Sequence, residues 1–164
     1  MIEGTDILKR LESNCIEHMV DENIHYFKID KKDYLNTARD LKDHMFRRLL
    51  TVSAVDWIKD NAFEVYFILH SMQKNIYVKV STHIPRREKV KIESLSEIWS
   101  NAALHEREIW EMFGIIFEGN KMLKPLFLEE WTGPPPFKKD FDWRKYVKRN
   151  FNITMPDFQK EGAK

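Results

Sequence analysis

The two neighbouring residues best suited to acid–base chemistry are His105 and Glu106, an imidazole next to a carboxylate. Such a pair could transfer a proton if both side chains met at one substrate atom. Adjacent residues on a helix, however, point about 100° apart, so these two groups diverge. We therefore predict no catalytic residue. A free-standing enzyme or binding module that uses His105, Glu106 and the basic, aromatic C-terminal segment stays open as the alternative.

Metal and cofactor sites also have little support in the sequence. The histidines show neither a His-x-x-x-His spacing nor a spacing paired with cysteine, the patterns typical of metal sites. Cys15 is the single cysteine, so the chain has neither a disulfide framework nor a cysteine set for an iron–sulfur cluster. Its five glycines form no phosphate-binding loop. We predict no metal or cofactor site in this chain.

Glu106 lies where an apolar residue is expected. Ser94 with Glu97 predicts a capping box at the start of a helix, and Gly114 a left-handed cap at its end. Glu106 falls about 20° from the middle of that helix's apolar stripe. The stripe comprises Leu95, Ile98, Trp99, Ala102, Ile109 and Phe113. A buried carboxylate costs several kcal/mol unless it is partnered. We expect basic partners on the 85–91 loop, at Lys138 and Lys139, or on another chain.

The flank of this helix permits a simpler interpretation. Arg107 and Glu111 are four residues apart and could form an ion pair worth a few tenths of a kcal/mol. Periodicity alone therefore favours an ordinary surface helix with a salt-bridged side.

The remaining pattern predicts an α+β domain, with helices packed on a small antiparallel or mixed sheet. Amphipathic periodicity predicts helices over Glu3–Val20 and Lys31–Leu49. A strand is expected over Ile24–Ile29. Alternating apolar residues and turn-like breaks predict an antiparallel meander over Thr51–Trp57, Phe63–His70 and Ile76–Ile84. In that meander, His70 and His83 could face each other as a structural pair.

The C-terminal segment has a different character. From residue 119 on, it contains five of the six prolines, little periodicity and many large aromatic side chains. Residues 134–150 hold six basic residues against two acidic ones, which suggests contact with an acidic surface. We predict a compact domain over residues 1–118 and an extended arm over residues 119–164 that wraps over a partner. A solvated tail is the simpler alternative.

Bulk properties restrict the class of protein. An apolar share of 43% is enough for one hydrophobic core. A net charge of +1 does not point to nucleic acid. No run of 18 apolar residues and no signal-peptide pattern occur, so we expect a soluble, cytoplasmic chain held at a membrane only by partners.

Four ordered segments carry a family resemblance. They are Thr51–Trp57, Glu106–Phe117 with its Glu-Arg-Glu triplet, Leu126–Trp131, and Pro136–Phe141. Together they resemble the thirty-kilodalton subunit, NuoC-like, of NADH–quinone oxidoreductases of the complex I family, which recurs in membrane-bound hydrogenases. The chain departs from that pattern after Gly119, where Asn120-Lys121 replaces a usual His-Pro pair, and at Lys124-Pro125, where two arginines are usual.

The resemblance implies a non-catalytic scaffold subunit in the hydrophilic arm of a membrane-bound respiratory complex that couples electron transfer to ion translocation. Its neighbours would be a large hydrogenase-like subunit and a small iron–sulfur subunit. Iron–sulfur clusters, with nickel–iron as a further option, would belong to those neighbours. The chain would lie at the cytoplasmic face of the membrane, and an archaeal hydrogenase or sulfur-reducing complex is the favoured subtype. Residues expected to serve structure or the interfaces with other subunits are Glu106, Arg107, Glu108, Glu111, Phe113, Gly114, Trp131, Phe137, Lys138, Lys139, Asp140 and Phe141.

Overall fold

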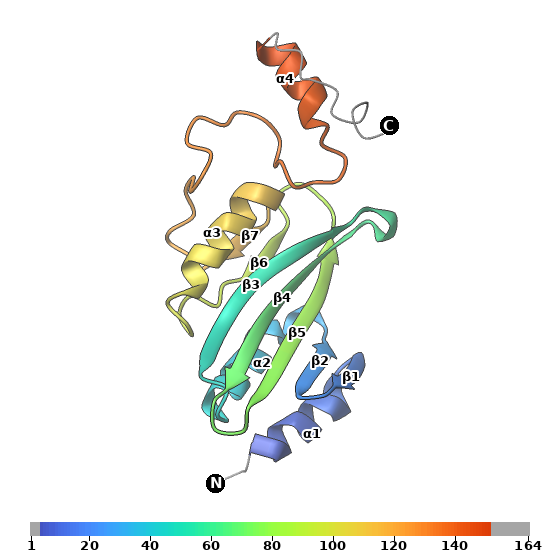
Figure 1. Ribbon diagram of the computed structural model, residues 1–164, viewed down its shortest axis with the longest axis vertical. Coiled ribbons are helices and arrows are strands. Elements are labelled where there is room, and N and C mark those ends of the chain that lie inside the picture. Colours follow the sequence, from blue (N-terminus) through green and yellow to red (C-terminus); the bar gives the residue numbers. More distant parts are fainter. Residues whose placement is uncertain (1–3, 152–164) are drawn as a thin grey trace, which may run out of the picture.

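A computed structural model describes residues 4–151 of the chain (Figure 1). The helices are α1 (Gly4–Asn14), α2 (Tyr34–Asp43), α3 (Ala102–Phe113) and α4 (Trp143–Phe151). The long strands are β3 (Arg48–Trp57), β4 (Ala62–Ser71) and β5 (Ile76–Pro85), and the short strands are β1 (Glu17–Asp21), β2 (Ile24–Lys28), β6 (Lys91–Glu93) and β7 (Ile116–Glu118). Single 3₁₀ turns occupy Lys31–Asp33 and Ile58–Asp60. None of the helices within residues 4–151 is long and apolar enough to cross a membrane.

A mixed sheet of five strands forms the centre, in the order β1-β2-β5-β4-β3. The β3–β4–β5 meander is antiparallel, as predicted, with Phe67 opposite both Val52 and Val80. The β1–β2 hairpin joins β5 through a parallel pairing of β2 with β5, which makes the sheet mixed. A separate parallel pair, β6 with β7, lies beside α3 and was not predicted, because three-residue strands leave almost no periodic signal.

One hydrophobic core lies between the inward face of the sheet and the helices. Alternate residues of β4, Phe63, Val65, Phe67 and Leu69, are fully buried on that face. Residues of α1, α2 and α3 belong to the same cluster. This arrangement confirms the predicted α+β class.

The first two helices are shorter than predicted. The first ends at Asn14, because the residues after it form β1 and pair with β2, a long-range contact that local periodicity does not report. The second ends at Asp43, where Met45 adopts a left-handed φ of 84° and the Phe46 N–H donates to the Leu41 carbonyl at 3.0 Å. That geometry closes the helix and directs Phe46 into the core.

Two further expectations were wrong. His70 pairs with Tyr77 and His83 with Glu64 in the β4–β5 register, so the two histidines do not face each other. Helix α4 lies within the segment expected to be extended, where its nine residues of alternating basic and aromatic type conceal a helical period.

Candidate functional site

Helix α3 begins at Ala102 rather than near Leu95, so the predicted capping box is wrong. Ser94 lies outside the helix and donates its hydroxyl to Glu106 Oε2 at 2.6 Å. The predicted end is confirmed, because Gly114 has a φ of 78° and its N–H donates to the Trp110 carbonyl at 2.9 Å.

Glu106 is fully buried, as the stripe predicts, but its partners are neutral. Its carboxylate accepts hydrogen bonds from the Ser94 hydroxyl, from the Leu95 N–H at 2.6 Å and from Asn120 Nδ2 at 2.9 Å. The expected basic partner is therefore wrong: three neutral donors replace it. Burial raises the pKa of Glu106, and these three hydrogen bonds offset part of that rise.

Asn120 is the residue of this site that sequence reasoning missed. Its amide joins the start of the arm to α3, donating to Glu106 and to the Ala103 carbonyl at 3.1 Å, while its Oδ1 accepts from the Met122 N–H at 2.8 Å. The signal was its position, since Asn120 is one of the departures from the family pattern.

Arg107 and Glu111 do not pair with each other; both bind the arm. The Glu111 carboxylate accepts from three successive backbone N–H groups, those of Leu126, Phe127 and Leu128, at 3.1, 2.9 and 2.8 Å. Arg107 donates to the carbonyls of residues 124 and 125. We call Glu106, Arg107 and Glu111 the α3 clasp, because together they bind the chain before the helix and the chain after it.

A second contact binds the arm at the end of α3. The Phe137 N–H donates to the Met112 carbonyl at 3.0 Å, and the Phe137 ring meets Phe113 edge-on, with centroids 5.7 Å apart. At Gly114 a β-carbon would lie 3.0 Å from Pro135, so glycine also permits this close approach.

A third contact is an ion-pair cluster between the sheet and the arm. Arg86 binds the buried Asp56 through two nitrogens at 2.6 and 3.0 Å, and Asp140 through two nitrogens at 3.1 and 2.6 Å. The Lys139 N–H also donates to Asp56, at 2.8 Å. Burial acts to raise the pKa of Asp56, but the hydrogen bonds from Arg86 and Lys139 outweigh it and hold that pKa below its usual value.

The outer part of the arm has its own aromatic cluster. The Trp131 ring lies 4.8 Å from Tyr146 and 5.8 Å from Phe141, and Trp131 Nε1 donates to the Pro134 carbonyl at 2.9 Å. This cluster binds α4 to the preceding chain, and Figure 1 shows α4 standing off from the body of the domain.

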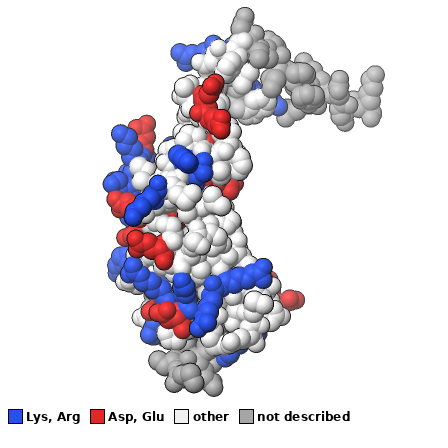
Figure 2. Space-filling view, turned by 90° about the vertical axis from the view of Figure 1, so that its left-hand side faces the viewer, with Lys and Arg blue, Asp and Glu red and all other residues white. Residues whose placement is uncertain are grey.

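The remaining predicted residues lie on the surface. Glu108 is exposed and makes no hydrogen bond or ion pair among the residues that the structure describes. The Lys138 and Lys139 ammonium groups lie 6.0 Å from the Phe63 ring and 5.7 Å from the Trp57 ring. Large apolar side chains are exposed along α3 and the arm, namely Leu104, Met122, Phe127, Phe137, Trp143 and Phe151. Figure 2 shows acidic and basic side chains interspersed over the side of the molecule that it presents.

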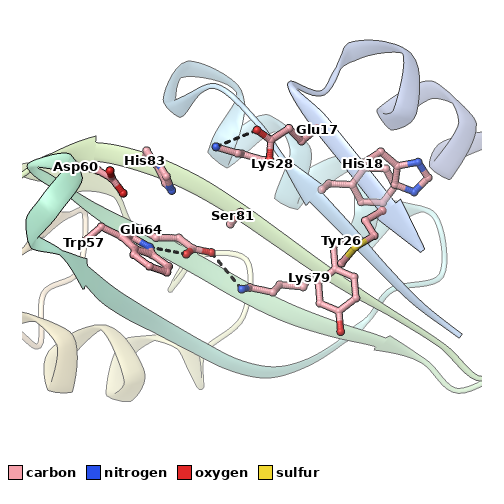
Figure 3. A pocket seen from close by; sticks show the side chains of 12 residues that line it. Glu17, His18, Tyr26, Lys28, Trp57, Asp60, Glu64, Lys79, Ser81 and His83 are labelled. Atoms are coloured by element: carbon pink, nitrogen blue, oxygen red, sulfur yellow. Dashed lines mark hydrogen bonds and ion pairs between the residues drawn. The ribbon is translucent and has the colours of Figure 1, made fainter. Parts of the chain in front are cut away.

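The outward face of the sheet carries a hollow of about 680 Å³ (Figure 3). Its central carboxylate, Glu64, accepts from Trp57 Nε1 at 2.9 Å and pairs with Lys79 at 3.1 Å. On the β1–β2 side, Glu17 and Lys28 pair at 3.3 Å. These charges satisfy one another and do not converge on one point that a substrate could occupy. Within the described residues, no three His, Cys, Asp or Glu side chains are grouped to hold a metal ion.

Comparison with known proteins identifies the family. The profile of the family described as "Respiratory-chain NADH dehydrogenase, 30 Kd subunit" matches residues 27–147. The chain belongs to this family. The C subunit of NADH-quinone oxidoreductase from Erythrobacter litoralis is 33% identical over 124 residues, 74% of this chain and 47% of that protein. The C/D subunit from Psychrobacter cryohalolentis is 28% identical over all of this chain and 32% of its own length. The chain thus spans about half or less of these curated relatives.

Solved structures agree with this assignment to the 30-kDa-subunit family. A chain from the membrane-bound sulfane sulfur reductase, an archaeal respiratory membrane complex, aligns with a TM-score of 0.82 at 30% identity over 98% of both chains. A trypsin-resistant fragment of Nqo5 aligns with a TM-score of 0.61 over 74% of this chain and 98% of the fragment, and its 18% identity shows the fold alone. The family predicted from the four sequence segments is confirmed.

Proposed function

We propose that this chain is a non-catalytic scaffold subunit of a complex I-like, membrane-bound oxidoreductase. The observation that carries the proposal is the use of the family signature: the charged groups of Glu106, Arg107 and Glu111 are bound to groups of the same chain. Glu106 is 0% exposed and accepts three hydrogen bonds, so no substrate can reach its carboxylate. This burial disfavours the alternative of an enzyme that uses His105 and Glu106.

The partners proposed are the large hydrogenase-like subunit and the small iron–sulfur subunit. The C/D relatives support the first of these, because their names join the C and D subunits in one chain that contains the length of this protein. A covalent fusion requires that the two parts lie close together. The arm, with its exposed apolar side chains, is the surface proposed to contact the large subunit.

Redox chemistry would then belong to the partners. Iron–sulfur clusters, and nickel–iron if the complex is a hydrogenase, would be bound by those subunits, and electron transfer would drive ion translocation by membrane subunits. The likeness to a chain of the sulfane sulfur reductase supports an archaeal-type, sulfur-reducing subtype. We place the chain at the cytoplasmic face of the membrane, as a peripheral part of the complex.

Purification of the native complex tests this function. A small affinity tag on this chain, used on detergent-solubilised membranes, should recover the large subunit and the iron–sulfur subunit in constant ratio. The sequence of that large subunit then decides the subtype: loss of both Cys-x-x-Cys pairs would exclude a nickel–iron hydrogenase. A tagged chain recovered alone, with turnover on a small substrate, would contradict the proposal.

A further inference from the structure

Helix α4 separates basic and apolar side chains onto opposite sides. It carries Arg144, Lys145, Lys148 and Arg149 and no acidic residue. At 100° per residue, its aromatic and aliphatic side chains occupy one arc of about 140°, and the four bases occupy the opposite arc. The apolar members are Trp143, Tyr146, Val147 and Phe151.

The acidic residues next to α4 are already engaged within the chain. Asp140 binds Arg86, as described above. Asp142 accepts from the Lys145 N–H at 3.1 Å, a helix cap, and pairs with the Lys145 side chain at 3.3 Å. Three cations, those of Arg144, Lys148 and Arg149, therefore face outward with no ion pair among the described residues.

The orientation of α4 is set from one side only. Tyr146 packs against Trp131 and Phe141, and the close approach of Gly133 makes room for it, since a β-carbon there would lie 2.8 Å from the Tyr146 ring. The rest of the apolar arc stays open, with Trp143 46% and Phe151 61% exposed.

We propose that α4 docks in an apolar groove bordered by carboxylates on the large subunit. Trp143 and Phe151 would enter the groove, while Arg144, Lys148 and Arg149 would meet acidic side chains on its rim. This inference rests on the proposed function and adds the chemistry of the surface that receives the helix. A protein groove fits better than a lipid surface, because three free apolar side chains on nine residues bury too little area for stable membrane binding.

Affinity measurements across a range of salt concentrations test the proposal. The full chain would be titrated onto the immobilised large subunit of its native complex at ionic strengths from about 0.05 to 0.5 M. The triple variant Arg144→Gln, Lys148→Gln, Arg149→Gln should bind about tenfold more weakly at low salt and lose most of its salt dependence. The variant Trp143→Ala, Phe151→Ala should weaken binding at every salt concentration. A matched control, Lys32→Gln, Lys59→Gln, Lys74→Gln, removes the same charge from exposed turns elsewhere and should bind like the natural chain.

The outcomes separate this inference from the proposed function. Binding of the natural chain that neither variant changes would overturn the docking of α4 and leave the scaffold function intact. Absence of any binding by the natural chain would overturn both. Recruitment to phosphatidylserine vesicles that the triple variant loses, with unchanged affinity for the large subunit, would show that α4 binds lipid and would overturn the groove.

Discussion

Glu106 and Glu111 lie on different sides of α3, and each carboxylate accepts hydrogen bonds from three groups outside the helix. Those of Glu106 come from the chain before the helix and from Asn120 after it. Those of Glu111 come from the backbone of the arm. A carboxylate can accept several hydrogen bonds at once, which explains why acidic residues suit both positions.

Removing the inner carboxylate should destabilise the domain. Glu106→Ala leaves the Ser94 hydroxyl, the Leu95 N–H and the Asn120 amide buried without an acceptor. We expect the free energy of unfolding in urea to fall by about 2–4 kcal/mol. Glu108→Ala changes an exposed neighbour on the same helix and should stay within about 0.5 kcal/mol. Equal effects of the two substitutions would contradict the assigned role of Glu106.

The raised pKa of Glu106 predicts a pH dependence. Because the folded-state pKa lies above the ordinary value of 4.5, the folded protein binds this proton more tightly than the unfolded chain does. The resulting stabilisation is complete below about pH 4.5 and is lost as pH rises through the folded-state pKa. The difference in unfolding free energy, natural chain minus Glu106→Gln, should therefore decrease from about pH 4 upward. A difference that increases with pH would show that the pKa is lowered instead.

Helix α3 and the proximal arm form one structural unit, bound by the α3 clasp, the Phe113–Phe137 contact and the Arg86 cluster. The position of α3 within the family signature, the burial of Glu106 and the cap at Gly114 could all be predicted, because they depend on local periodicity and residue type. The partners of Arg107 and Glu111 could not. Both bind backbone atoms 15 to 18 residues away along the chain, and a backbone N–H or carbonyl carries no sequence signal.

Loss of the outer carboxylate should release the arm locally. In Glu111→Ala, the amides of residues 126–128 lose their acceptor, so their hydrogen exchange should become about tenfold faster or more. Exchange in β4 should not change, since that strand is far from the contact. Glu108→Ala serves as the matched control, and unchanged protection in Glu111→Ala would show that the arm is bound by other contacts.

The Arg86 cluster should protect the arm from proteolysis. Asp140→Asn weakens the two hydrogen bonds that Arg86 donates to the arm, so trypsin should cleave at Lys138 and Lys139 several-fold faster. Asp142→Asn, which changes a neighbouring carboxylate bound only within α4, should leave that cleavage rate unchanged. Equal rates for both variants would argue against an anchoring role for Asp140.

The whole molecule combines a folded domain with an arm whose outer end presents unpaired apolar and basic side chains. The division at residue 118 stays a prediction, and its test is truncation after Gly133. The shortened chain should keep its fold by circular dichroism, because the sheet and α3 are retained. It should assemble with the large subunit much more weakly. Assembly as tight as that of the full chain would remove the arm from the interface.

The central claim is that the family signature on α3 serves structure and assembly rather than chemistry. Its most direct test is the turnover of purified, fully assembled complex that carries Glu106→Gln, expressed per mole of complex. We predict a lower yield of assembled complex, because one acceptor oxygen becomes a donor in a buried site. Each assembled complex should turn over at the natural rate. A complex that assembles in full yield and is inactive would contradict the claim and make Glu106 a catalytic residue.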